Sequence, residues 1–324
     1  MAQTGDWTIP THLQPRPEQT GFDLDAALHS MVMVHADVPE DALTAVTLGT
    51  DRIGNGVVID ADGLVLTIGY LITEAQSVWL TTHDGDVVAG HALALDQCSG
   101  FGLVLPLGRL DAPPLQRGSS SSCAVGDDVI VMGHGGRPHA LNAKIVAKRE
   151  FAGYWEYLLE EALFASPPHP LWGGTALIGG DGCLLGVGSL LVHQVIDGET
   201  ADANLFVPVD LLEPVLDDMI RLGRPDRPAR PWLGMYTVEV QERLVVGGLI
   251  QGAPAHRAGI RLGDTVTAVA GRRVSRLADM FRNVWSIGPA GATIPLTIIR
   301  GRRTLEVNVR SADRNDFLRK PRRH

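Results

Sequence analysis

The chain has 324 residues, of which 45% are hydrophobic, 20% are charged and 37 are glycines. This length and composition indicate a folded globular protein of about two domains, and they exclude a disordered or fibrous chain. The net charge of -9 argues against general affinity for nucleic acid, because phosphate binding needs clustered lysines and arginines.

The N-terminal stretch MAQTGDWTIPTHLQPRPEQTGFDLD has no basic segment followed by an apolar one, so we expect no secretory signal. No uninterrupted apolar run is long enough to predict a membrane span. The three cysteines, Cys98, Cys123 and Cys183, fit neither a disulfide framework nor a zinc site, because they are odd in number and widely spaced. We therefore expect a cytoplasmic protein with reduced cysteines and without a metal or cofactor.

An N-terminal extension is expected over residues 1–27, and a β-rich domain over residues 28–222. In the second range, short apolar runs alternate with Gly, Asp and Asn turns, which is typical of sandwiches and barrels. Strands are predicted within SMVMVHADV, GVVIDADGLVLTIGYLI, SVWLTTHDGDVVAGHALAL, FGLVLPL and DDVIVMG. Asp-Gly pairs at 62–63, 84–85 and 181–182 predict turns between strands.

Two segments of this domain depart from the strand pattern. WEYLLEEALF, at 155–164, predicts one or two helical turns. PVDLLEPVLDDMIRLG has apolar residues at helical spacing and ends at Gly223, so it predicts a helix with Pro214 near its first turn. The proline-rich and charged stretch over residues 223–230 is typical of a stiff linker.

A second β-rich domain with one amphipathic helix, LADMFRNVWS, is predicted over residues 231–312. The basic tail over residues 313–324 is expected to be solvated. The alternative for this tail is a patch for docking or for a membrane surface.

Five segments within residues 50–210 resemble, in order and spacing, the barrel domain of the HtrA (DegP) serine proteases. They are GNGVVIDADGLVLTIGYLI, DQCSGFGLVLPL, AVGDDVIVMGHGG, HPLWGGTALIGGDGCLLGVGS and NLFVPVDLL. The resemblance implies a mainly β fold, a chymotrypsin/trypsin-like double β-barrel. It also implies that the histidine base of the family falls at Tyr70, the aspartate at Gly100 and the nucleophilic serine at Trp172.

The triad mechanism needs a hydroxyl or thiol beside a base that a carboxylate orients, and none of these three residues can take its role. We therefore predict a degenerate triad and a pseudoprotease. The large side chains of Tyr70, Phe101 and Trp172 are expected to fill the emptied cleft. The alternative is a relocated site built from other hydroxyls and histidines, with the candidates Ser166, Thr175, Ser189, His134, His139 and His169.

The second domain resembles the PDZ domain that follows the HtrA barrel, on the motifs WLGM and GAPAHRAGIRLGDTVTAVAGRRV. In such domains a peptide adds as an edge strand, and backbone N–H groups of a loop hold its terminal carboxylate. The resemblance implies a peptide site whose loop comprises Trp232, Leu233, Gly234 and Met235, and whose apolar pocket lies beside Met280, Phe281 and Val284. The alternative is that these helix residues belong only to the core of the domain.

These expectations together predict a scaffold or regulator that binds protein C-termini or extended peptides. An active serine endopeptidase with a relocated nucleophile is one alternative. A non-catalytic subunit that regulates an active HtrA-like protease is the other. The resemblance further implies a homo-oligomer, in particular a trimer, with contacts expected in the N-terminal extension.

Overall fold

The computed structural model describes residues 7–196 and 199–319. Their contacts divide the chain into two compact units. The first unit contains the residues up to Arg149 and Glu161–Asp226, and the second contains Glu150–Glu160 and Arg227–Arg319. The segment Glu150–Glu160, called the hairpin tip below, therefore belongs to the second unit although the chain on either side of it belongs to the first.

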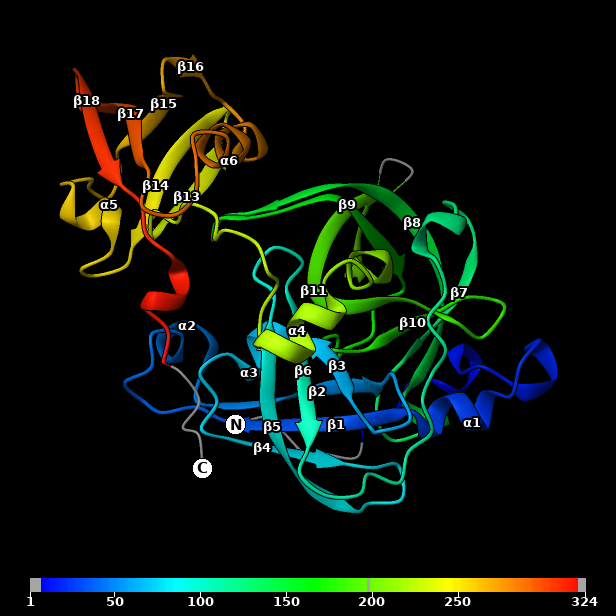
Figure 1. Cartoon of the computed structure of the whole chain (residues 1–324). Helices are drawn as coiled ribbons and strands as arrows, with labels where there is room; N and C mark the ends of the chain where they lie inside the picture. The colour runs from blue at the N-terminus through cyan, green and yellow to red at the C-terminus, as the bar shows by residue number, and fades with distance from the viewer. Residues whose placement is uncertain (1–6, 197–198, 320–324) are drawn as a thin grey trace. The chain divides into compact units, whose positions relative to one another are not determined.

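The first six strands close into a barrel in the order β1-β2-β3-β6-β5-β4, drawn in blue to cyan in Figure 1. Neighbouring strands are antiparallel, and closure leaves no unpaired strand edge. Gly63 and Gly85 take positive φ angles of 83° and 92° in the predicted turns. The strands are β1 (Met31–Asp37), β2 (Asp51–Val58), β3 (Val65–Ile68), β4 (Ser77–Thr81), β5 (Val87–Leu95) and β6 (Phe101–Pro106).

The next six strands close into a second barrel in the order β10-β11-β12-β9-β8-β7, drawn in green in Figure 1. Leu163 and Phe206 are completely buried in its interior. The predicted double β-barrel is thus confirmed. The strands are β7 (Asp128–Met132), β8 (Ala140–Gly153), β9 (Tyr157–Ser166), β10 (Ala176–Ile178), β11 (Leu184–Ile196) and β12 (Glu199–Pro208).

The helical turns predicted at 155–164 are wrong, because Tyr157–Ser166 form strand β9. Phe164 of this strand pairs with Leu205 of β12. The glutamates and leucines of this segment favour a helix in isolation, but pairing within the barrel buries its apolar side chains, and that gain outweighs local propensity.

The helix expected after residue 207 is shorter than predicted. A 3-10 turn at Val209–Leu211 comes first, and α4 (Leu216–Leu222) begins only after Pro214. Proline lacks an N–H and disfavours the helical conformation of the residue before it, so it separates the two pieces. Gly223 ends α4 in the left-handed conformation, as expected from the sequence. The other helices of this unit are α1 (Leu24–His29), α2 (Ala45–Leu48) and α3 (Gly69–Ile72).

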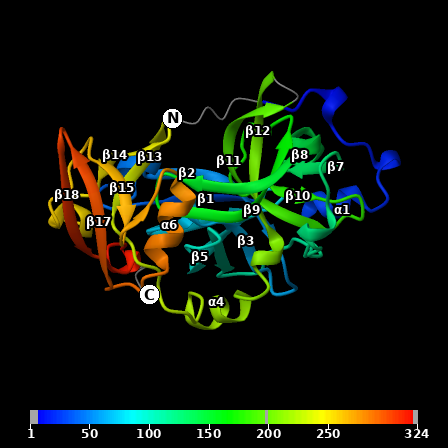
Figure 2. The ribbon, with the colours of Figure 1, turned by 90° about the horizontal axis from the view of Figure 1, so that it is seen from above.

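The second unit is a sheet in the order β13-β14-β15-β17-β18, with the short β16 paired to β15. Helix α6 is seen lengthwise beside these strands in Figure 2. Its apolar side chains belong to the same core cluster as those of the sheet. Strand β13 lies at one edge of the sheet. The elements are β13 (Met235–Val240), β14 (Arg243–Leu249), α5 (Pro254–Arg257), β15 (Thr265–Val269), β16 (Arg272–Arg273), α6 (Leu277–Trp285), β17 (Thr293–Arg300) and β18 (Arg303–Arg310).

None of the helices within residues 7–196 and 199–319 has the length and apolar character that crossing a membrane requires.

Candidate functional site

A buried asparagine on β2 holds the loop over residues 169–175, where the nucleophile was expected. The Asn55 N–H and its Nδ2 both donate to the Gly173 carbonyl, at 2.8 and 3.2 Å, and Nδ2 also donates to the Leu171 carbonyl at 2.9 Å. Its Oδ1 accepts the N–H of His134 at 2.8 Å. Asn55 of the first barrel is therefore hydrogen-bonded to two loops of the second barrel. The sequence analysis missed Asn55, although it stands in the quoted GNG motif.

Two of the three predicted triad positions lie side by side. The Tyr70 hydroxyl donates to the Ser189 carbonyl at 3.0 Å. A Cβ on Gly173, the residue after Trp172, would lie 2.6 Å from that hydroxyl. Burial raises the pKa of Tyr70, so the phenol stays protonated at neutral pH and is a donor rather than a base.

The third predicted position, Gly100, adjoins Tyr70 through the backbone. Its carbonyl accepts the N–H of Gly69 at 2.7 Å, and its φ of 85° suits a residue without a side chain. The nearby carboxylate of Asp96 is buried and accepts the hydroxyl of Ser99 at 2.8 Å. This carboxylate holds the turn before β6.

Two of the three candidate hydroxyls of a relocated site bond to backbone carbonyls. Ser166 donates to the Asp202 carbonyl, and Thr175 to the Trp172 carbonyl, each at 2.9 Å. Ser189 is buried, and its carbonyl is the acceptor for Tyr70. In the part of the chain that the structure describes, none of these three hydroxyls is hydrogen-bonded to a histidine.

The rings of the candidates His134 and His169 bond to backbone groups, whereas Nδ1 of His139 is buried without a hydrogen-bond partner among the described residues. In His169, Nδ1 accepts the N–H of Leu171 and Nε2 bonds to the His139 carbonyl, both at 3.1 Å. Burial lowers the pKa of His169 to about 4. Burial also lowers the pKa values of His134 and His139, and His134 bonds to the Thr82 carbonyl at 2.9 Å.

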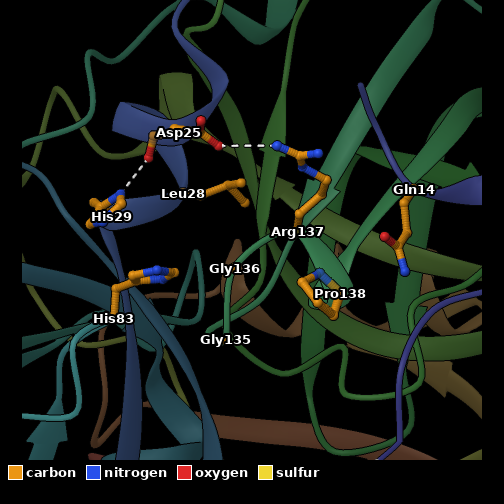
Figure 3. Close-up of a pocket in the computed structure, with 9 residues that line it drawn as sticks. All are labelled: Gln14, Asp25, Leu28, His29, His83, Gly135, Gly136, Arg137 and Pro138. Carbon is orange, nitrogen blue, oxygen red and sulfur yellow. Dashed lines mark hydrogen bonds and ion pairs between the residues drawn. The ribbon is translucent and has the colours of Figure 1, made fainter. Parts of the chain in front are cut away.

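A pocket of about 500 Å³ opens beside the turn that follows His134. Figure 3 shows Asp25 bonded to two neighbours, since its backbone carbonyl contacts Nδ1 of His29 at 2.6 Å and its carboxylate pairs with Arg137 at 3.6 Å. The pocket is lined by Gln14, Asp25, Leu28, His29, His83, Gly135, Gly136, Arg137 and Pro138.

Two groups of side chains in the first unit place ligand atoms close enough to hold a metal ion. In one group the His29 and His83 rings lie 4.1 Å apart. In the other, Nε2 of His35 pairs with Asp51 at 2.7 Å on the surface. The groups are His29, His83 and Asp84, and His35, Asp37 and Asp51. The prediction that the chain uses no metal stays a prediction.

In the second unit, three consecutive backbone N–H groups converge on one carboxylate, that of Glu156 in the hairpin tip. The N–H groups of Leu233, Gly234 and Met235 donate to it at 2.9, 2.7 and 3.3 Å. Trp232 was expected in this set, but its N–H donates to the Ala312 carbonyl at 3.0 Å instead.

Glycine is required at the centre of this loop. The φ of Gly234 is 71°, and a Cβ there would lie 2.3 Å from the Cβ of Ala253. The left-handed backbone turns successive N–H groups to the same side, which makes an anion-binding concavity. Burial raises the pKa of Glu156 to about 7, although the three N–H donors and Arg314 oppose this effect.

The predicted helix residues Met280, Phe281 and Val284 are at most 2% exposed. They share one apolar cluster with Leu233 and Met235 of the loop. Leu158, from the hairpin tip, belongs to the same cluster. The hairpin tip thus contributes an apolar side chain to the core cluster that contains the loop and the helix residues.

Comparison with known proteins covers both units. The trypsin-like peptidase domain family matches residues 54–187, and the PDZ domain family matches residues 231–310. The probable periplasmic serine endoprotease DegP-like of Chlamydia pneumoniae is 24% identical over 277 residues, which cover 79% of this chain and 54% of that protein. The putative protease Do-like 14 of Arabidopsis thaliana is 27% identical over 292 residues, covering 78% of this chain and 64% of that protein.

Solved structures show the same fold. The HtrA-type protease AlgW with tripeptide has a TM-score of 0.52 at 17% identity, over 93% of this chain and 99% of that one. The serine endoprotease from Yersinia pestis has a TM-score of 0.50 at 18% identity, over 90% of this chain and 98% of that one. The chain spans 54% of the length of the chlamydial relative. Its architecture is HtrA/DegP-like, with a trypsin-like peptidase domain followed by a PDZ domain.

Proposed function

We propose that this chain is an HtrA-like protein that captures extended peptides or protein C-termini in its PDZ domain and has no peptidase activity of its own. The observation that carries this proposal is the convergence of three N–H groups, from Leu233 to Met235, on one carboxylate. A terminal carboxylate presents the same pair of oxygens, and an edge strand such as β13 can pair with an added strand. The solved structures of AlgW with a tripeptide and with a decapeptide give further support.

The chemistry at the expected catalytic positions supports the loss of activity. Tyr70 is a protonated phenol, Gly100 has no side chain, and the indole of Trp172 is no nucleophile. In the trypsin-like mechanism the oxyanion hole uses the N–H groups of the nucleophile and of the residue two positions before it. Pro170 stands at that earlier position and has no N–H to donate.

A relocated protease site finds little support in the geometry. General-base activation needs a hydroxyl within hydrogen-bond reach of an available ring nitrogen. The hydroxyls of Ser166 and Thr175 bond to carbonyls, and both ring nitrogens of His169 are engaged. We therefore prefer peptide capture to a hidden endopeptidase.

The role of regulatory subunit, the homo-oligomer and the trimer stay predictions. The cytoplasmic location also stays a prediction, and the relatives named periplasmic argue against it.

Peptide capture is tested with a labelled extended peptide that ends in leucine, offered to the full chain with a free or an amidated C-terminus. We expect the free acid to bind at least about tenfold tighter, because the amide loses charge-assisted hydrogen bonds to the loop of Leu233, Gly234 and Met235. Fluorescence anisotropy measures both Kd values. Equal affinities for the two peptides would reject recognition of a terminal carboxylate.

The aromatic side chains near the expected catalytic centre differ in burial. Phe101 is fully buried, whereas Tyr70 and Trp172 are partly exposed, and the filling of the cleft by these three side chains stays a prediction. We expect Phe101→Ala to lower the free energy of unfolding by about 3 to 5 kcal/mol. Trp172→Ala should cost only about 1 to 2 kcal/mol, because less of its surface leaves water on folding. Urea unfolding compares the two variants, and equal losses would show that Trp172 is a core residue.

The buried His169 predicts an acid-sensitive fold. Its pKa falls from 6.5 to about 4 on folding, so its stabilising contribution is present above pH 6.5 and is lost as the pH falls towards 4. The loss amounts to about 3 kcal/mol. We expect His169→Gln to flatten the dependence of the unfolding free energy on pH over this range, as measured by urea unfolding. The control is His193→Gln, on an exposed part of β11, and an equal flattening in that variant would contradict the assignment.

A further inference from the structure

We propose that the hairpin tip, Glu150–Glu160, is an internal ligand that blocks the peptide groove, so that an external peptide binds only by displacing it. The inference rests on the proposed function, because the blocked groove is the one proposed to capture peptides. Four sets of contacts within the second unit support it.

The first contact is the carboxylate. Glu156 receives the N–H groups of Leu233, Gly234 and Met235, which are the donors that a terminal carboxylate needs. Its backbone takes the left-handed conformation, with a φ of 64°, so the tight turn between β8 and β9 directs the side chain to the loop. A side-chain carboxylate thus occupies the place of a chain terminus.

The second contact is a backbone hydrogen bond to the edge strand. The N–H of Thr237, on the edge strand β13, donates to the Tyr154 carbonyl at 3.1 Å. Glu156 accepts a hydrogen bond from Gly234, and Tyr154, two residues earlier, accepts one from Thr237, three residues later than Gly234. The tip therefore runs antiparallel to β13. The Tyr154 and Tyr236 rings lie edge to face at 5.7 Å. Peptides that add to a sheet edge use the same backbone pairing.

The third contact is apolar. Leu158 follows Glu156 by two residues and is only 6% exposed. It belongs to the cluster that contains Met280, Phe281 and Val284, beside which the pocket for the last side chain of a peptide is expected. The hairpin tip therefore supplies a carboxylate, a backbone carbonyl bonded to the edge strand and an apolar side chain, which are three kinds of contact that a peptide ligand makes.

The fourth contact is ionic. Arg282 of α6 pairs with both Glu150 and Glu160, one on each strand of the hairpin. Arg276 also pairs with Glu150 at 3.3 Å. These groups are partly exposed to water, so the ion pairs orient the tip more than they hold it. Tyr154 at the turn is 51% exposed, which leaves the tip open to displacement.

The test compares two matched variants of the full chain. Glu156→Gly removes the carboxylate and keeps a residue that tolerates positive φ. Glu242→Gly makes the same change at an exposed turn between β13 and β14, where φ is 60°. The probe is an N-terminally labelled extended peptide that ends in leucine with a free carboxylate.

We expect E156G to bind this peptide about tenfold tighter than the wild type, because the apparent Kd rises as the fraction of open groove falls. E242G should bind like the wild type, and E156Q, which keeps one acceptor oxygen, should lie between. Equal affinity of E156G and the wild type would overturn the internal ligand while leaving peptide capture intact.

Hydrogen exchange of the Leu233, Gly234 and Met235 amides gives a second readout that needs no peptide. These amides should exchange about tenfold faster in E156G than in the wild type or E242G, because they lose their acceptor. Unchanged exchange in E156G would overturn the internal ligand. Faster exchange without peptide binding by any variant would support the internal ligand and reject the proposed capture of peptides.

Discussion

Three consecutive backbone N–H groups of the second unit hold one carboxylate, that of Glu156. A buried carboxylate is costly unless hydrogen bonds replace its hydration, and here the loop from Leu233 to Met235 supplies them. The loop takes this form because Gly234 adopts a left-handed conformation that leaves no room for a side chain. The raised pKa of Glu156 shows that the hydrogen bonds offset only part of the cost of burial. Such a site favours any carboxylate that arrives on an extended segment.

The first unit has a trypsin-like double β-barrel, and Tyr70, Gly100 and Trp172 stand where the family resemblance implies the triad. Two closed barrels satisfy the backbone of their strands and leave the loops between them to carry function. The loop over residues 169–175 is held by Asn55 through carbonyl groups, and the hydroxyls near it bond to other carbonyls. The hydrogen bonds of Asn55 thus stabilise this loop.

The sequence predicted the strands and turns that depend only on neighbouring residues. Alternating apolar runs predicted the barrel strands, and Asp-Gly pairs predicted turns at Gly63 and Gly85. The family resemblance assigned Tyr70 and Trp172 to two triad positions, and the Tyr70 hydroxyl lies beside Gly173, the next residue after Trp172.

Contacts between distant segments could not be predicted in this way. Glu156 lies 77 residues before Leu233, and the segment WEYLLEEALF has the composition of a helix. Its pairing with β12 made the helical interpretation wrong. Because the segment is part of a hairpin, Glu156 lies at the turn and accepts the N–H groups of Leu233 and Gly234. Composition alone does not predict this contact. Asn55 was missed for the same reason, because its partners Leu171 and Gly173 are remote in the chain.

The central claim, binding without catalysis, is tested most directly by reaction of the purified chain with a fluorophosphonate probe, followed by intact mass measurement and peptide mapping. We expect no adduct under conditions that label an active trypsin-like protease completely, because the proposed function has no activated nucleophile and the hydroxyls of Ser166 and Thr175 donate to backbone carbonyls. One adduct per chain, mapped to a serine such as Ser166 or Ser189, would contradict it and would identify an active nucleophile.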